Sequence, residues 1–119
     1  MFRLRSTPRT APALPQILAD AQLGRAILID VRDISELKAS GKIKGAKHIP
    51  LMQLANVADR RHPDFDPSLQ TDADIAVYCA SGGRSQMATQ ILAQLGFQNV
   101  TNMGGFGQLA SSGAEVETV

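Results

Sequence analysis

The chain of 119 residues contains one cysteine, Cys79, and no tryptophan. A single cysteine excludes a disulfide within the chain and any metal site built from several thiolates. If this thiol is reactive, no second cysteine of the chain can resolve the species that forms on it. Whatever binds to the sulfur must then leave to a separate molecule.

Strong charge and long hydrophobic runs are also absent. The formal net charge is +1, which gives no electrostatic reason to expect nucleic acid or a membrane surface as a partner. No apolar run approaches the length of a membrane span. The composition of 44% hydrophobic and 19% charged residues is typical of a globular protein. The length of 119 residues fits one domain, which we expect over residues 13–119. We expect a cytoplasmic location.

Residues 1–12 contain three arginines and no acidic residue. They lack the continuous apolar core of a secretory signal, and a basic terminus of this kind resembles a transit peptide only faintly. We interpret them as a flexible N-terminal tail.

Apolar strands alternate with helical patterns along the remaining chain. The pattern predicts helices over 15–24, 32–41, 51–58 and 85–95, strands over 26–31, 44–50, 75–78 and 99–103, and a long polar loop over 59–74. The helix over 85–95 is expected to bury Met87, Ala88, Ile91, Leu92 and Leu95 and to end at Gly96. This alternation predicts a small three-layer α/β domain, in which helices flank a mostly parallel sheet of about five strands.

Cys79 follows the predicted strand over 75–78, where ligands bind in open α/β sheets. The adjacent Gly82 and Gly83 allow a tight turn whose N–H groups point inward at the start of a helix, and such a turn binds anions and favours a thiolate. Arg84 adds a permanent charge and a planar fork of donors. A lone cysteine after an apolar strand is more often a packing residue, but this loop favours a nucleophile. We therefore take Cys79 as the candidate catalytic residue and the following six residues as candidate substrate-binding residues, namely Ala80, Ser81, Gly82, Gly83, Arg84 and Ser85.

The segment "CASGGRS" resembles the C-x-x-G-x-R-S loop of rhodanese-like domains, the sulfurtransferases. Three further segments are similar to family motifs in the same order: "LIDVRDISEL", "GKIKGAKHIPL" and "LGFQNVTNMGGF". The resemblance covers Ile27 to Gly113 almost continuously. It implies a rhodanese-like fold and a Cys79 thiolate that takes sulfane sulfur from a small anionic donor such as thiosulfate. The resulting persulfide would pass its sulfur to a thiophilic acceptor, which is cyanide in vitro and a thiol or redox protein otherwise, without a metal or organic cofactor.

Two other classes of function remain open. Cys79 and Arg84 are spaced C-x4-R, the loop length associated with sulfur chemistry, whereas related phosphatases and arsenate reductases have C-x5-R. A phosphatase or arsenate-reductase-like enzyme is one alternative, and a non-catalytic interaction module with the same fold is the other.

The sequence also departs from the family pattern at three places. Lys42 stands where the family often has histidine, and Leu109 lies near the position of a common tryptophan. The neutral pair Ala80-Ser81 replaces the basic pair of some thiosulfate-using relatives, which leaves the donor open.

Several other polar residues have structural interpretations. Asp30 and Arg32 should emerge at the same sheet edge as Cys79, and we expect Arg32 to pair with Glu36 one helical turn away rather than to shape the site. His48 is expected to be structural because no metal ligands stand at suitable spacing.

The polar loop and the second glycine pair have similar interpretations. His62 is expected to be solvated, although together with Arg60 and Arg61 it could form a rim that attracts anions. Gly104 and Gly105 are expected to form a turn beside the Cys79 loop.

Overall fold

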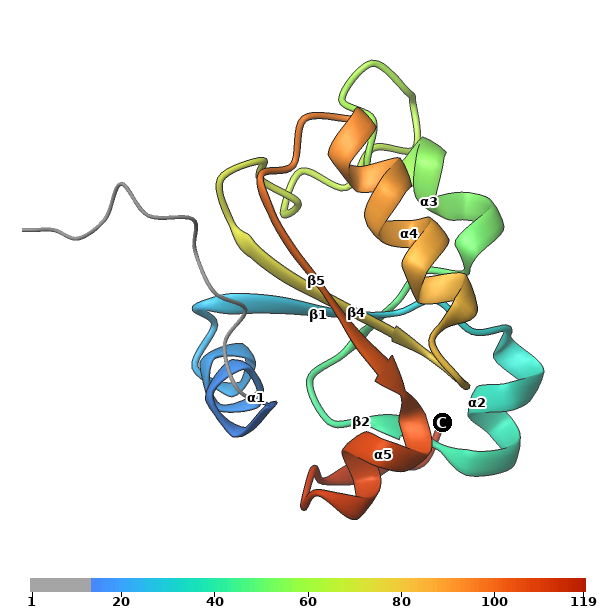
Figure 1. Cartoon of the computed structure of the whole chain (residues 1–119). Coiled ribbons are helices and arrows are strands. Elements are labelled where there is room, and N and C mark those ends of the chain that lie inside the picture. The colour runs from blue at the N-terminus through green and yellow to red at the C-terminus, as the bar shows by residue number, and fades with distance from the viewer. Residues whose placement is uncertain (1–13) are drawn as a thin grey trace, which may run out of the picture.

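A computed structural model describes residues 14–119, with side chains from residue 16 onward, so the predicted tail over residues 1–12 lies outside the described residues. Helices and strands alternate along the chain, except that β3 follows β2 directly (Figure 1). The helices are α1 (Leu14–Gln22), α2 (Ile34–Ser40), α3 (Leu51–Val57), α4 (Gly83–Gln94) and α5 (Phe106–Ser111). The strands are β1 (Ala26–Asp30), β2 (Lys42–Ile43), β3 (Lys47–His48), β4 (Asp74–Cys79), β5 (Asn99–Gly105) and β6 (Val116–Glu117).

The central sheet is parallel throughout and has the strand order β3-β1-β4-β5. The predicted α/β architecture with a mostly parallel sheet is thereby confirmed, with four strands in the sheet rather than about five. The expected strand over 44–50 is reduced to β3, because Gly45 turns the chain with a φ of +88° and Pro50 has no N–H for a strand ladder. The remaining strands, β2 and β6, form a separate antiparallel pair that the sequence did not predict, since two residues are too few to show an alternating pattern.

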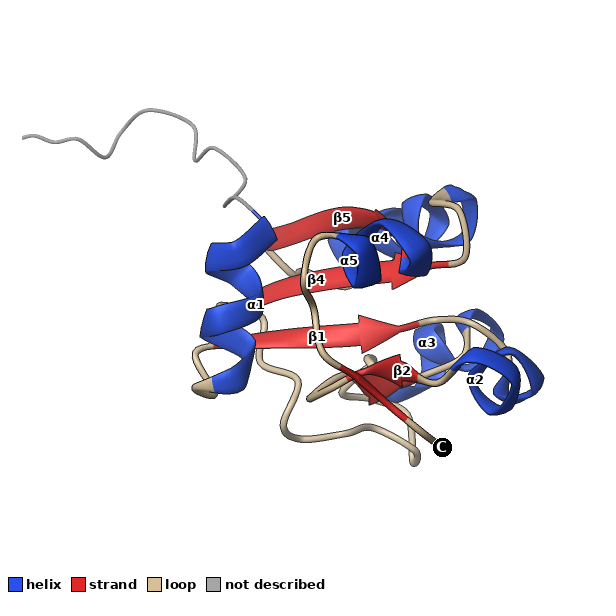
Figure 2. Cartoon of the chain, turned by 90° about the horizontal axis from the view of Figure 1, so that it is seen from below, coloured by secondary structure: helices blue, strands red, loops and turns tan. Residues whose placement is uncertain are grey.

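Helices cover both faces of the sheet (Figure 2). On one face, α3 and α4 contribute Leu54, Ala88 and Leu92 to a buried apolar cluster. On the other face, Ile17 of α1 and Leu109 of α5 lie in a second cluster. The central strands β1 and β4 are buried on both faces, as their continuous apolar sequences predict.

Successive residues of β4 point to opposite faces of the sheet. Tyr78 lies in the cluster under α1 and α5, whereas Val77 and Cys79 lie in the cluster under α3 and α4. The thiol therefore faces the side of the sheet on which the next helix, α4, returns.

The buried side of α4 differs from the predicted one. Ser85, Ala88 and Leu92 are its fully buried residues, at the i, i+3, i+7 spacing of one helical face. Ile91 and Leu95 are partly buried against the core, but Met87 is 54% exposed, so its predicted burial is wrong. Since Ser85 occupies the inward position of the first turn beside Cys79, Met87, two residues on, points to solvent.

No helix within residues 14–119 has both the length and the apolar character needed to cross a bilayer. The expected cytoplasmic location stays a prediction.

Candidate functional site

Cys79 is the last residue of β4, as the sequence predicts, and lies at the carboxyl edge of the sheet. The chain turns over Ala80–Gly82 and enters α4 at Gly83. In Figure 1 the tip of β4 leads through this loop into the beginning of α4. The candidate site thus lies where β4 ends and α4 begins.

The Cys79 sulfur accepts hydrogen bonds from N–H groups at the beginning of α4. The N–H of Gly82 lies 3.0 Å from Sγ, and the N–H of Ser85 lies 3.4 Å from it. The Ser85 hydroxyl is also 3.4 Å from Sγ. Gly82 is the N-cap of α4 and Ser85 its third residue, so Sγ takes the acceptor place that an N-cap side-chain oxygen usually has. This arrangement needs the left-handed backbone of Gly82, whose φ is +103°.

These contacts favour the thiolate. Burial of the sulfur opposes ionisation, but hydrogen bonds from the Ser85 hydroxyl and from the N–H groups of Ser85, Ser81 and Gly82 outweigh it. They lower the pKa of Cys79 from 9.0 to about 7. The positive end of the α4 dipole acts in the same direction. A large fraction of Cys79 is therefore ionised at neutral pH.

The rate of alkylation by iodoacetamide should consequently rise with pH and reach half of its plateau near pH 7, since only the thiolate reacts and its pKa is about 7. The reaction can be followed by intact mass against pH, with a free cysteine peptide, whose pKa is about 8.5, as the control. A midpoint equal to that of the peptide would contradict the hydrogen-bonded thiolate.

The sulfur lies beneath the loop. Cys79 is only 1% exposed, whereas Ala80, Ser81 and Gly83 are exposed above it. A group that reaches Sγ must therefore be small or present a terminal atom. A bulky substituent is excluded unless the loop moves.

Arg84 does not present a free donor fork. Its Nη1 and Nη2 donate to the two carboxylate oxygens of Glu36 at 2.6 and 2.9 Å, a bidentate pair between α4 and α2. The Arg84 hydrogen bonds lower the pKa of Glu36 to about 2, and the same contact raises the pKa of Arg84. The carboxylate largely balances the cation, so the N–H groups of the loop carry most of the attraction for an anion.

Glu36 is thus a site residue that the sequence reasoning placed elsewhere. It was expected to pair with Arg32, and that prediction is wrong, because Arg32 binds Asp30 instead. Glu36 also accepts a hydrogen bond from the N–H of Asp33 at the start of α2. Its pairing with a residue 48 positions away leaves no periodic signal in the sequence.

Asp30 and Arg32 form a buried structural network. The Asp30 carboxylate is fully buried, and the Arg32 guanidinium contacts it with Nε and Nη2. Further donors of Arg32 bind Ser40 Oγ and the carbonyl of Gly41. The guanidinium lies 4.3 Å from the ring centre of Phe106, on the α5 side of the sheet. The expectation that these residues do not shape the site is consistent with this placement, because Cys79 faces the opposite side.

Gly104 and Gly105 lie against the Cys79 loop as predicted, but they are the last two residues of β5 and not a turn. A Cβ on Gly105 would be 2.5 Å from the carbonyl oxygen of Ala80, and a Cβ on Gly82 would be 3.6 Å from Gly104 Cα. The backbone at the end of β5 therefore packs directly against the backbone of the Cys79 loop, with no room for a side chain at Gly105. The same end of β5 carries Asn102, which contacts Ser85 and Gly82 and which the sequence reasoning missed. An asparagine within a strand carries no signal of such a role.

The histidines and the basic loop lie apart from the sulfur. His48 Nε2 bonds the carbonyl of Arg32, in keeping with its structural interpretation. Arg60, Arg61 and His62 follow α3 and precede β4, which places them at the amino edge of the sheet. They form no rim around Cys79. Within residues 14–119, no group of three or more histidine, cysteine or acidic side chains could hold a metal ion.

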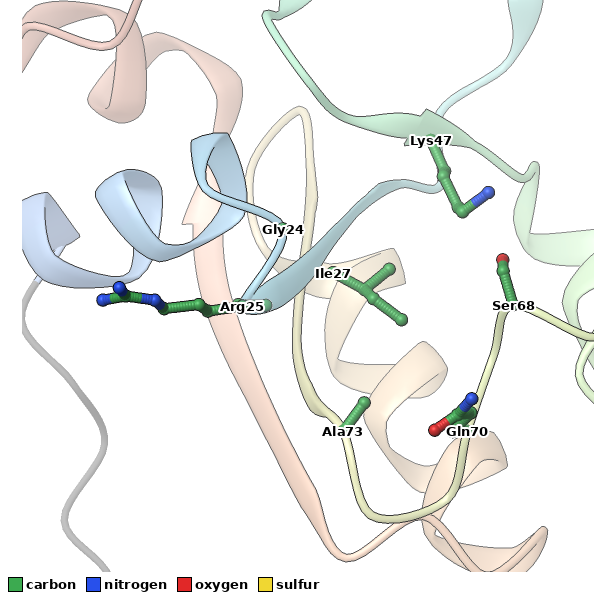
Figure 3. Close-up of a pocket in the computed structure, with 8 residues that line it drawn as sticks. Gly24, Arg25, Ile27, Lys47, Ser68, Gln70 and Ala73 are labelled. Carbon is green, nitrogen blue, oxygen red and sulfur yellow. The ribbon is translucent and has the colours of Figure 1, made fainter.

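A hollow of about 360 Å³ also opens at the amino edge (Figure 3). Ile27, Lys47, Ser68 and Gln70 are among the residues that line it. Ile27 lies in the first half of β1, whereas Cys79 ends the neighbouring parallel strand β4, so this hollow is not part of the candidate site.

Comparison with known proteins gives a family for this arrangement. Residues 11–111 match the model of the Rhodanese-like domain. The chain belongs to the rhodanese-like domain family. The motifs around Cys79, Asp30 and Gly104 that resembled this family all lie within the matched residues.

Relatives of this rhodanese-like chain include the human thiosulfate:glutathione sulfurtransferase, which is 32% identical over 100 residues, covering 78% of this chain and 85% of the relative. Among solved structures, the human single-domain sulfurtransferase TSTD1 superposes with a TM-score of 0.69 at 26% identity, covering 88% of this chain and 97% of the other. A Rhodopseudomonas palustris protein described as a possible tyrosine phosphatase has a TM-score of 0.72 at 25% identity, covering 93% of this chain and 99% of the other. Relatives at 32% to 35% identity are named as thiosulfate sulfurtransferases, which supports sulfurtransferase activity at the level of the family.

Proposed function

We propose that residues 13–119 form a single sulfurtransferase domain that carries sulfane sulfur on Cys79 as a persulfide. The observation that supports this most is the set of N–H groups that point at Sγ from Gly82 and Ser85. They favour a thiolate at neutral pH, and an ionised sulfur is the form that attacks another sulfur atom.

In the first step the Cys79 thiolate attacks the outer sulfur of a donor such as thiosulfate. The Sγ–S bond forms as the S–S bond of thiosulfate breaks, and sulfite leaves with the electron pair of that bond. The outer sulfur of the new persulfide takes up negative charge at the N-terminus of α4, where the dipole and the loop amides of residues 80–85 stabilise it. No proton is needed, because nucleophile and leaving group are both anions.

In the second step a thiophilic acceptor attacks the outer sulfur of the persulfide. Cyanide forms thiocyanate in this way, and the electron pair of the broken bond returns to Sγ as the thiolate. This two-step exchange is ping-pong catalysis with a covalent intermediate. A thiol acceptor would receive the same sulfur and become a persulfide itself.

The acceptor must come from outside the chain, since Cys79 is its one cysteine. The human relative is named for glutathione as well as thiosulfate, and a small thiol fits a sulfur that lies under a narrow loop. We therefore propose a small thiol or the exposed cysteine of a redox protein as the acceptor, with a small anion as the donor.

The engaged state of Arg84 argues for sulfur transfer over phosphate hydrolysis. A phosphatase of the C-x5-R type needs its arginine fork for a tetrahedral oxyanion, whereas here both outer nitrogens of the fork bind Glu36. The loop is also one residue shorter, C-x4-R. The lowered pKa of the Cys79 thiol also argues against a non-catalytic interaction module, because binding a partner does not require an ionised thiol.

Brief incubation with thiosulfate should add the mass of one sulfur atom to the protein, as the persulfide on Cys79 forms. Intact mass spectrometry measures this gain, and cyanide should remove it with the release of thiocyanate. Protein alkylated at Cys79 beforehand is the control and should gain nothing. No added sulfur on the unmodified protein, despite free thiol, would contradict the proposal.

A further inference from the structure

We propose that Asn102 is a positioning residue for Cys79. The side-chain amide of Asn102 holds the loop over residues 80–85 so that the N–H groups of the loop point at Sγ. The catalytic purpose of this positioning rests on the proposed function, but the geometry and the test concern only the ionisation of the Cys79 thiol. Asn102 belongs to β5, next to β4, and touches the loop from the side.

The Asn102 amide uses its whole hydrogen-bonding capacity around the loop. Its Oδ1 accepts from the Ser85 hydroxyl at 2.7 Å and from the N–H of Gly104 at 2.8 Å. Its Nδ2 donates to the carbonyl of Gly82 at 3.2 Å and to Gln86 Oε1 at 3.3 Å. One neutral side chain thus joins the loop, the first turn of α4 and the end of β5.

The residues held by Asn102 are the ones that bind the sulfur. Gly82 and Ser85 both donate their N–H to Sγ, and each is bonded to Asn102 through a second group. Gly82 and Gly83 are adjacent glycines with little conformational restriction of their own. Contacts from outside the loop therefore help to keep one conformation, and the Asn102 amide is the one that binds Gly82 and Ser85, beside the Arg84–Glu36 pair and the packing of Gly105 on Ala80.

The Ser85 hydroxyl has one proton and three acceptors within reach. Asn102 Oδ1 lies at 2.7 Å, the Gly82 carbonyl at 3.1 Å and Sγ at 3.4 Å. Asn102 thus competes with the sulfur for this proton, yet it fixes the orientation of two N–H donors and of the hydroxyl itself. Since both N–H donors to Sγ depend on the position that Asn102 holds, whereas competition affects only the hydroxyl proton, we expect the positioning effect on the thiol to be the larger one.

Only a side chain that both accepts and donates hydrogen bonds, such as an amide, can make all of the contacts of Asn102. A carboxylate could accept from Ser85 and Gly104 but could not donate to the Gly82 carbonyl, and its negative charge would oppose the thiolate. The charged groups beside the loop are Arg84, Glu36 and Asp33, of which Arg84 and Glu36 bind each other. Replacing Asn102 therefore leaves the local ion pair in place.

The test is the pH profile of Cys79 alkylation in Asn102→Ala. We expect the pKa of Cys79 to rise from about 7 to about 8, which leaves about tenfold less thiolate well below neutral pH. Asn102→Asp keeps the size and both acceptor contacts, and should raise the pKa at least as far. Thermal unfolding and circular dichroism establish that each variant is folded.

The matched control is Asn99→Ala. Asn99 lies at the start of the same strand, and its amide contacts the carbonyl of Asp72 at 3.5 Å, at the sheet edge away from Cys79. Its replacement should leave the alkylation profile unchanged. A folded Asn102→Ala or Asn102→Asp protein with an unchanged or lowered thiol pKa would overturn the proposal. Loss of sulfur transfer is not needed for this result, so the positioning role and the proposed function can fail separately.

Discussion

Cys79→Ser should lower the rate of thiocyanate formation from thiosulfate and cyanide by at least about a thousandfold, to the rate without enzyme. A hydroxyl of high pKa cannot attack the donor sulfur, and no second cysteine of the chain can replace the thiolate. Serine is similar in size and can accept from Gly82 and Ser85 in place of Sγ. The variant should therefore fold normally, and the loss should lie in catalysis.

The measurement is the initial rate of thiocyanate release over a range of thiosulfate concentrations, with circular dichroism of both proteins as the control for folding. Hydrolysis of an aryl phosphate is followed in parallel, because one structural neighbour is described as a possible tyrosine phosphatase. Sulfur transfer retained in folded Cys79→Ser would refute the persulfide mechanism. Faster phosphate hydrolysis than sulfur transfer by the unmodified protein would favour the phosphatase alternative.

Arg32→Ala should lower the free energy of unfolding by about 3–5 kcal/mol, because it leaves the fully buried Asp30 carboxylate without its cation. The guanidinium also binds Ser40 and Gly41, so its removal leaves further polar groups unsatisfied. Domains of this kind have only about 5–15 kcal/mol of stability, and the loss is therefore a large part of it. Urea unfolding followed by circular dichroism measures it.

The chain contains a matched control for this prediction. Arg61 contacts Asp59 through the same Asp-x-Arg geometry, with the backbone N–H and Nε of Arg61 both donating to Asp59 Oδ1. The Arg61 side chain is 84% exposed, so water replaces the partner and Arg61→Ala should not measurably change stability. If Arg32→Ala and Arg61→Ala lowered the free energy of unfolding equally, burial of the Asp30–Arg32 pair would not explain the loss.

Local sequence patterns were sufficient to predict several parts of this protein. Continuous apolar runs identified β1 and β4, because strands buried on both faces need no polar alternation. The alternation of strands and helices then predicted a parallel sheet, and the position of Cys79 at the carboxyl end of a central strand followed from it. The glycine pair after Cys79 indicated a turn with inward N–H groups, and Gly82 and Ser85 have this geometry.

The contacts between polar side chains could not be predicted in this way, because they form between residues far apart in the chain. Glu36 binds Arg84 rather than Arg32, and Asn102 binds Ser85 and Gly82, across separations that no helical or strand period encodes. The pair β2–β6 is likewise formed by residues far apart in the chain. Side-chain hydrogen bonds depend on positions in space to within a few tenths of an ångström, and these positions exist only after the helices have packed on the sheet. The sequence thus located the reactive sulfur, whereas packing selected the groups that surround it.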